Sequence, residues 1–299
     1  MPELPDITLY IEHLERRLRG VRLIEARASG PNLLRTVEPT LGSCTGHRVA
    51  AVSRLGKRIV IALERGPRLV IHLMIAGRLH WAPGKRAPGG RRPILRLAFE
   101  SGTLTLTEAG TRQRASLHVL ADDRALATLD PHGLEPLDSD AEAFAQRLRR
   151  EDHTLKRALT DPRILSGIGN AYSDEILHRA QLSPLRRTTQ LSDEEMARLR
   201  GATQEILKSW TARLRAESGE AFPENVAAFR EGFAVHGRYG EPCPVCGSPV
   251  QRIRYAENET NYCARCQVGG RLLADRGLSR LLNDDWPRTL EELEEMRGR

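Results

Sequence analysis

Two Cys-x-x-Cys pairs near the C-terminal end place the strongest constraint on how this chain can fold. The pairs are Cys243 with Cys246 and Cys263 with Cys266, and sixteen residues separate them. Each pair can present two thiolates from a tight turn, so together they predict one tetrahedral zinc site closed around a hairpin. Redox-active or unligated thiols are the alternatives. Because all four ligands would be protein thiolates, a zinc ion here is expected to be structural and not catalytic.

The first six residues, MPELPD, are the second unusual feature. Two prolines within five residues predict that this stretch is not helical. The apolar spacing in residues 7–20 then predicts an amphipathic helix that ends at Gly20.

Short apolar runs separated by Gly, Pro and charged turns fill the next hundred residues. They lie at 21–27, 48–63, 68–79, 94–100, 103–109 and 116–121. Strands of this length and turn spacing predict an antiparallel β-sandwich or barrel. A Pro- and Asp-rich stretch at 129–140 reads as a linker.

Helical periodicity returns after this linker. It predicts helices over 141–150, 153–161, 171–180 and 192–217, and a short acidic helix or frayed tail over 289–299. The resulting expectation is an α+β protein with four parts: a β-sandwich domain at 1–130, a helical domain at 131–235, a zinc finger at 236–270 and an extension at 271–299.

Composition limits the class of partner. The 299 residues contain 46 Lys and Arg against 39 Asp and Glu, which gives a net charge of +7. This surplus fits a polyanionic partner but does not demand one. No apolar run approaches the ~18 residues of a membrane span, and the N-terminal residues do not resemble a secretory signal. We therefore expect a cytoplasmic protein without a membrane partner.

The segment SGIGNAYSDEIL at 166–177 can bind an anion. Gly167 and Gly169 bracket a turn, and Asn170 is expected to cap the helix that follows. The N–H groups of such a turn and helix start can hold a phosphate. An ordinary helix–helix turn explains the same residues, and this alternative stays open on the motif alone.

Taken in order, five segments resemble the formamidopyrimidine-DNA glycosylase/endonuclease VIII family of base-excision repair enzymes. They are PELPD (2–6), RLGKRIV (54–60), HLMIAGRL (72–79), LKRAL with SGIGNAYSDEIL (155–177), and VHGRYGEPCPVCG with YCARCQ (235–267). The resemblance covers about residues 1–270. It implies a β-sandwich, a helix–two-turn–helix domain and a zinc-finger hairpin that together bind damaged double-stranded DNA as a monomer, in a bacterial-type cytoplasm with the nucleoid.

The resemblance also implies roles for particular residues. Pro2, freed by removal of Met1, matches the amine nucleophile, Glu3 the general acid, and Lys57 a lysine beside the lesion, with Asp6 as a supporting carboxylate. His72, Lys156 and Asn170 match contacts to the DNA backbone. Without the resemblance, Lys57 would be a turn lysine and His72 a half-buried strand residue.

The chain departs from the family pattern where it should meet DNA. The loop after His72 carries Leu73, Met74 and Ile75 as the expected wedge, and Met74 stands where the formamidopyrimidine branch has glycine. The segment 110–117 lacks the phenylalanine wedge, and Arg112 or Arg114 is expected to take part in DNA binding instead.

The finger shows a further departure. Asn258 replaces the arginine that the family carries at the finger tip. Arg254 or Arg276 could supply the missing charge to a phosphate. Arg252 and Arg254 alternate along one strand, so they either face the DNA backbone or are solvated strand residues.

Three functions remain open from the sequence. The leading hypothesis is a bifunctional glycosylase and abasic-site lyase that removes oxidised bases and cuts the strand by β- or β,δ-elimination. The second is a divergent member that acts mainly on abasic sites or unusual DNA structures. The third is a damaged-DNA-binding protein without catalysis.

Overall fold

The computed structural model describes residues 1–29, 32–84, 92–109, 113–224, 230–255, 258–275, 279, 281 and 287–297. The chain forms two compact units. The first comprises residues 1–133 and 209–228, and the second comprises residues 134–208 and 229–299. Among the described residues, no helix is long and apolar enough to cross a membrane.

The first unit contains two four-stranded antiparallel sheets. One has the order β1-β6-β7-β5, and its strands are β1 (Leu23–Ala28), β6 (Leu95–Phe99), β7 (Gly102–Glu108) and β5 (Gly77–Pro83). The other has the order β2-β3-β4-β8, with β2 (Val49–Leu55), β3 (Arg58–Leu63), β4 (Arg68–His72) and β8 (Ser116–Leu120). The sandwich predicted from the sequence is confirmed.

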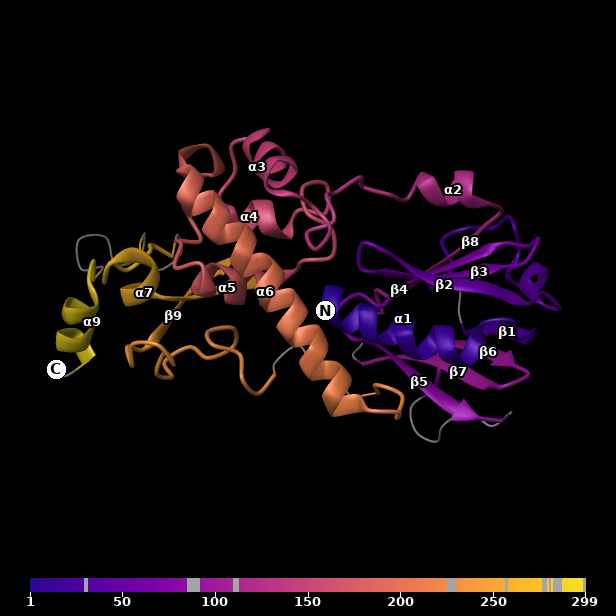
Figure 1. Cartoon of the computed structure of the whole chain (residues 1–299). Coiled ribbons are helices and arrows are strands. Elements are labelled where there is room, and N and C mark those ends of the chain that lie inside the picture. Colours follow the sequence, from indigo (N-terminus) through magenta and orange to yellow (C-terminus); the bar gives the residue numbers. More distant parts are fainter. Residues whose placement is uncertain are drawn as a thin grey trace. The chain divides into compact units, whose positions relative to one another are not determined.

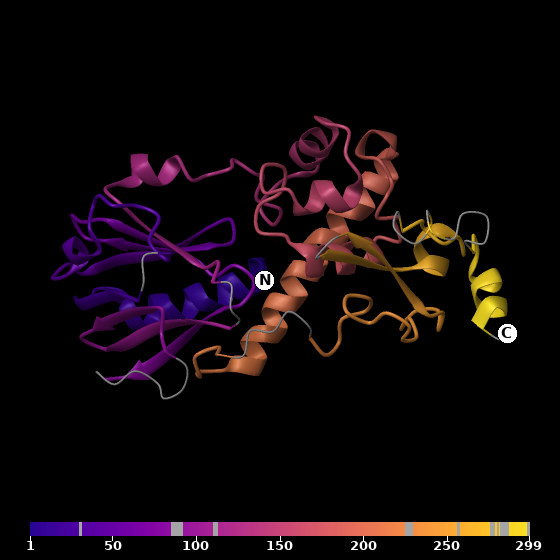
Figure 2. The ribbon, with the colours of Figure 1, turned by 180° about the vertical axis from the view of Figure 1, so that it is seen from behind.

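Helix α1 (Leu4–Leu18) shares one core with both sheets and runs between them in Figures 1 and 2. Its apolar face contributes Ile7, Tyr10, Leu14 and Leu18, all fully buried. The prediction that MPELPD is not helical is wrong, because α1 already begins at Leu4. Pro5 lies in the first turn, where a backbone N–H has no intrahelical acceptor, so an imino acid is tolerated there.

Two short helices pack against the sandwich. The 3-10 helix η1 (Leu41–Cys44) contributes Cys44 to the core, and α2 (Asp123–Ala127) lies over β8. Val60, Val70 and Leu120 form a smaller cluster on that side, against which Ala125 and Leu126 of α2 pack.

The second unit begins with helices, as the sequence predicts. These are α3 (Ala141–Arg149), α4 (Leu155–Thr160), α5 (Asn170–Arg179), η2 (Thr188–Gln190) and α6 (Asp193–Ser218). The finger follows as the antiparallel hairpin β9 (Val250–Tyr255) and β10 (Asn258–Cys263), then α7 (Ala264–Val268). The predicted C-terminal helix is present as α9 (Leu290–Arg297).

The C-terminal extension packs on the finger. Leu290 of α9 is buried with Ile253 and Tyr262 of the hairpin. Two backbone bonds fasten its start, because Leu272 N–H donates to Arg288 O and Leu290 N–H donates to Gly270 O. The extension therefore enlarges the small core of the finger.

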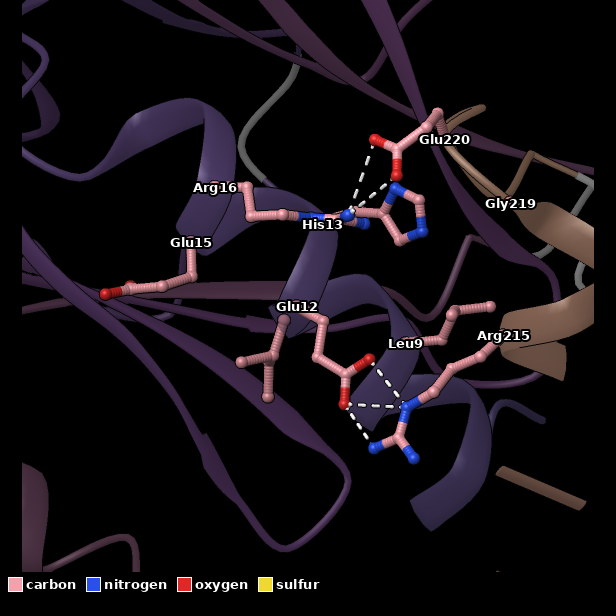
Figure 3. A pocket seen from close by; sticks show the side chains of 9 residues that line it. Leu9, Glu12, His13, Glu15, Arg16, Arg215, Gly219 and Glu220 are labelled. Carbon is pink, nitrogen blue, oxygen red and sulfur yellow. Dashed lines mark hydrogen bonds and ion pairs between the residues drawn. The ribbon is translucent and has the colours of Figure 1, made fainter. Parts of the chain in front are cut away.

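Helix α6 belongs to both units, since its residues from Ser209 onward pack with the first. There Arg215 pairs with Glu12, with 2.9 Å between Nε and Oε2, and Arg16 pairs with Glu220 at 3.4 Å (Figure 3). These pairs line a pocket of about 640 Å³ along the outer face of α1. The end of α6 and the loop after it thus form part of the sandwich unit.

Candidate active site and metal centre

The start of α1 fixes Glu3 and Asp6 against each other. Glu3 is the N-cap, with extended backbone and a side chain that is almost fully buried. Its backbone N–H donates to Asp6 Oδ2 at 2.8 Å, and the Glu3 carboxylate accepts the backbone N–H of Asp6. This reciprocal capping box satisfies two N–H groups at the helix start and fixes the Glu3 carboxylate against the first turn of α1.

Two cationic side chains, Lys57 and Arg78, influence the pKa of the N-terminal amine. Lys57 lies in the two-residue turn Gly56–Lys57 between β2 and β3, as predicted, and Arg78 lies at the start of β5. Burial lowers the pKa of the Met1 α-amine. Glu3 and Asp6 oppose this effect, and Arg78 and Lys57 reinforce it. The sequence does not predict this action of Arg78, although the residue lies in the segment HLMIAGRL (72–79).

His72 ends β4 and lies directly opposite Arg58 of β3. Burial, followed by the charges of Arg58, Lys57 and His118, lowers the pKa of His72 to about 4. His72 is therefore neutral at neutral pH. The charge of Lys57 therefore acts on both His72 and the N-terminal amine.

The turn after His72 differs from the predicted wedge. Leu73 is only 1% exposed and belongs to the core, so its side chain is not available for insertion into DNA in this structure. Ile75 is 50% exposed. Met74 has a φ of 52°, a left-handed conformation that costs a non-glycine residue ~1–2 kcal/mol.

The four cysteines of the finger lie together, with all four sulfur atoms within 4.8 Å of one another. Sγ of Cys243 is 3.9 Å from Sγ of Cys266, and Sγ of Cys246 is 3.4 Å from Sγ of Cys263. Tetrahedral Zn–S bonds of about 2.3 Å place their sulfurs about 3.8 Å apart, a value that lies between these two separations. Burial raises the pKa of Cys263 to about 11, and a bound cation would stabilise its thiolate. The cluster fits one structural Zn²⁺.

Three family models match the chain in sequence order. They are the formamidopyrimidine-DNA glycosylase N-terminal domain over residues 1–117, its H2TH domain over 132–217, and the zinc finger found in FPG and IleRS over 240–268. The formamidopyrimidine-DNA glycosylase of Thermus thermophilus is 34% identical over 279 residues, which cover 90% of this chain and 100% of the relative. That of Geobacter sulfurreducens is 32% identical and covers 89% of this chain and 100% of the relative. The chain belongs to the formamidopyrimidine-DNA glycosylase family.

Solved structures of this family show the same fold. The complex of Lactococcus lactis Fpg with DNA that contains an abasic site has a TM-score of 0.78 at 28% identity and covers 89% of this chain and 99% of that chain. MutM in complex with DNA that contains carbocyclic 8-oxo-G also has a TM-score of 0.78, at 27% identity, and covers 89% of this chain and 100% of that chain. The α+β architecture with a zinc-finger hairpin is therefore confirmed.

In the H2TH domain of this family member, Lys156 and Asn170 have internal partners. The Lys156 ammonium donates to Asn170 O, Ser173 Oγ and Asp174 Oδ1 at 2.6–2.8 Å. Asn170 is the first residue of α5 and not its cap, which is Gly169. Its amide donates to Glu259 O of β10 at 2.9 Å. Both side chains thus tie the GIGN turn to its surroundings, and their contacts with DNA remain predictions.

The arginines predicted to bind DNA lie in two regions. Arg114 is exposed and its backbone N–H donates to Glu108 at 2.9 Å. Arg254 is also exposed, and its N–H donates to Asp275 Oδ2 at 2.8 Å. Arg112 and Arg276 lie outside the described residues.

Arg252, two residues before Arg254, is engaged within the finger. Its guanidinium lies 3.5 Å from Glu259 Oε2 and 4.1 Å from the ring centroid of Tyr239. Asn258 is exposed at the start of β10. Arg254 is accordingly the better placed of these two arginines to supply the charge that Asn258 lacks.

Proposed function

We propose that this chain is a DNA glycosylase and abasic-site lyase whose nucleophile is the amine of Pro2 after removal of Met1. The observation that carries the proposal is the environment at the start of α1. Pro2 and Glu3 are buried there, and the same burial and cations that lower the pKa of the Met1 amine would act on the Pro2 amine. A lowered pKa leaves more of the amine unprotonated and reactive at neutral pH.

The chemistry follows from a secondary amine. The Pro2 nitrogen attacks C1′ of the damaged nucleotide and the bond to the base breaks, so that the base leaves with the bonding electrons and takes up the proton that the amine gives up. The ring oxygen then leaves C1′ with a proton from Glu3, while the nitrogen lone pair forms the C=N bond. The product is an iminium that acidifies the C2′ proton. Removal of this proton expels the 3′ phosphate, and a second elimination can expel the 5′ phosphate. Water then hydrolyses the iminium, which frees the Pro2 amine and leaves the sugar fragment as an aldehyde.

The remaining residues orient the catalytic groups or bind the phosphates of the DNA. Lys57 and Arg78 attract the phosphates that flank the lesion, and Asp6 orients Glu3 through the capping box. Neutral His72 donates a hydrogen bond to a phosphate. In the second unit, the GIGN turn and the exposed Arg254 contact the DNA backbone. We further propose that the protein acts as a monomer in the cytoplasm, with the nucleoid.

Divergent substrate preference is the second candidate function. Buried Leu73, strained Met74 and uncharged Asn258 all lie where family members meet DNA. They favour abasic sites or unusual DNA structures, which need less wedge insertion than an intact stacked base. A panel of duplex and single-stranded oligonucleotides, each with one lesion, would rank these substrates.

Borohydride trapping tests the catalytic proposal. Met-processed protein, verified by intact mass, is mixed with an abasic oligonucleotide and borohydride, and a covalent adduct at Pro2 is expected. The control retains Met1, so position 2 has an amide nitrogen and should give no adduct. A Lys57→Met variant should still be trapped. If the processed protein binds the oligonucleotide but gives no adduct, the proposal fails and a non-catalytic binding protein remains.

A further inference from the structure

Three residues of α5 hydrogen-bond to the finger or to the segment that leads into it. Glu175 accepts the backbone N–H groups of Ala234, Val235 and His236 at 2.7–3.0 Å. Asp174 Oδ2 lies 2.8 Å from His236 Nδ1 and accepts the N–H of Asn261 at 3.1 Å. The third attachment, one turn later, involves a metal ligand.

His178 lies in the last turn of α5, 6% exposed, with its Nε2 3.3 Å from Cys243 Sγ. A metal-bound thiolate has no proton and can only accept hydrogen bonds. The pair therefore requires the imidazole tautomer that carries its proton on Nε2. This geometry is an N–H···S bond from the helical domain to the metal centre.

We propose that His178 is a positioning residue of the zinc centre. Its Nε2–H bond fixes the orientation of the Cys243 side chain and withdraws electron density from the sulfur. Four thiolates around Zn²⁺ leave a net charge of −2 in a small, partly buried cluster, and a neutral donor offsets part of this charge without adding a competing ligand. Hydrogen bonds of this kind around a metal site change its affinity by ~10–100-fold when they are removed.

As a consequence, α5 and the finger are linked by a hydrogen bond to a metal ligand, Cys243. Cys243 joins the finger's first turn, where its N–H donates to Ser248 O and its carbonyl accepts Gly247 N–H, both at 2.8 Å. A thiolate fixed by His178 thus places this turn relative to α5. Loss of the bond would let the first Cys-x-x-Cys pair move independently of the helix.

The test uses full-length, zinc-loaded protein and two amide variants of similar polarity. In His178→Gln the amide nitrogen can take the place of Nε2, whereas in His178→Asn it is too short to reach the sulfur. His178→Phe removes the donor and keeps a ring. His132→Phe, at an exposed position of the first unit, is the control.

Zinc transfer to excess chromogenic chelator is the first readout. We expect release at least ~10-fold faster from the Asn and Phe variants, and near the wild-type rate from the Gln variant and the control. Equal release from all variants would overturn the proposal.

The second readout is the absorption of the Co²⁺-substituted proteins. A thiolate that loses a hydrogen bond donates charge more readily, so the sulfur-to-cobalt band should move to lower energy in the Asn and Phe variants and stay in place in Gln. If zinc release accelerates equally in Asn and Gln with an unmoved band, His178 acts only by packing and the proposal is wrong. Should the Phe variant not fold, the Asn–Gln pair decides by the same criteria. Neither readout uses DNA, so the result is independent of the proposed catalysis.

Discussion

The N-terminal site and the finger show two ways to hold functional residues in place. Glu3 and Asp6 are three positions apart and bond each other within one helical turn. The finger is fixed by contacts over long sequence separations: 60 positions between Glu175 and Val235, 65 between His178 and Cys243, and 87 between Asp174 and Asn261. Local restraint survives changes elsewhere, whereas long-range restraint depends on the metal and on a second module.

Removal of zinc should have the largest effect and should be confined to the long-range region. Structural zinc sites contribute on the order of 10 kcal/mol to folding. After chelation, hydrogen exchange should accelerate in β9, β10 and at the N–H groups of Ala234–His236. Strands β2–β4 should keep their protection. Undiminished protection of β9 and β10 in verified zinc-free protein would contradict this expectation.

Replacement of Glu3 by Gln should act on chemistry and leave the local fold intact. The amide oxygen can still accept the Asp6 N–H, but it cannot supply a proton to the sugar. We expect base excision to slow by ~10²–10⁴-fold in single-turnover assays on a lesion-containing duplex. Circular dichroism of the variant should match that of the wild type. An unchanged excision rate would remove Glu3 from the mechanism.

Glu175→Gln tests the long-range contacts without touching a metal ligand. Both carboxylate oxygens of Glu175 accept backbone N–H groups, so an amide NH₂ must face at least one donor. We expect the second unit to lose ~1–3 kcal/mol of unfolding free energy. Chemical denaturation monitored by exchange in β10 measures this loss. The exposed Glu205→Gln should change the same quantity by less than ~1 kcal/mol.

Acid should weaken the first unit through His72. Its folded pKa of about 4 lies below the ordinary value of 6.5, so the unfolded chain binds the proton first. The stability associated with neutral His72 is present above about pH 6.5 and is lost as the pH falls toward 4, by up to ~3 kcal/mol. In His72→Gln, the plot of unfolding free energy against pH should be flatter, while exposed His132→Gln should follow the wild type. Parallel curves for His72→Gln would refute this.

The smallest effect is expected for Asp6→Asn. The amide oxygen can still accept the Glu3 N–H, so only the charge at the helix N-terminus is lost. That loss should cost ~0.3–1 kcal/mol in thermal unfolding and change excision by only a few fold. A loss comparable to that of Glu3→Gln would mean that Asp6 has a chemical role of its own.

The contrast between the two regions also explains what the sequence could predict. The longer helices, the strands, the Gly56–Lys57 turn and the cysteine cluster follow patterns shorter than thirty residues, and the sequence predicts them. It does not predict the short helices η1, α2, η2 and α7. The helix start was missed because proline is tolerated in a first turn. The sequence pattern favours Asn170 as the cap, because Gly169 has no side-chain acceptor and gives a weaker signal.

The positions that sequence reasoning did not reach depend on packing. Leu73 belongs to the same apolar run as Ile75, yet only the fold decides that one is buried and the other exposed. Arg78 lies in one of the segments that carry the resemblance, but only the folded sandwich brings its charge near the N-terminal amine. Nothing local distinguishes His178 from any other helical histidine.

Helix α6 has a practical consequence for anyone who divides this chain. The loop after it supplies Phe222, whose ring lies 5.8 Å from that of Tyr10, and Glu220, whose carbonyl accepts from Arg17 at 2.8 Å. A fragment that stops at residue 133 would contain every strand of the sandwich and every predicted catalytic side chain. It would nevertheless leave the outer side of α1 without the segment that covers it. The sandwich unit is therefore discontinuous in the gene, and a single stop codon cannot produce it whole.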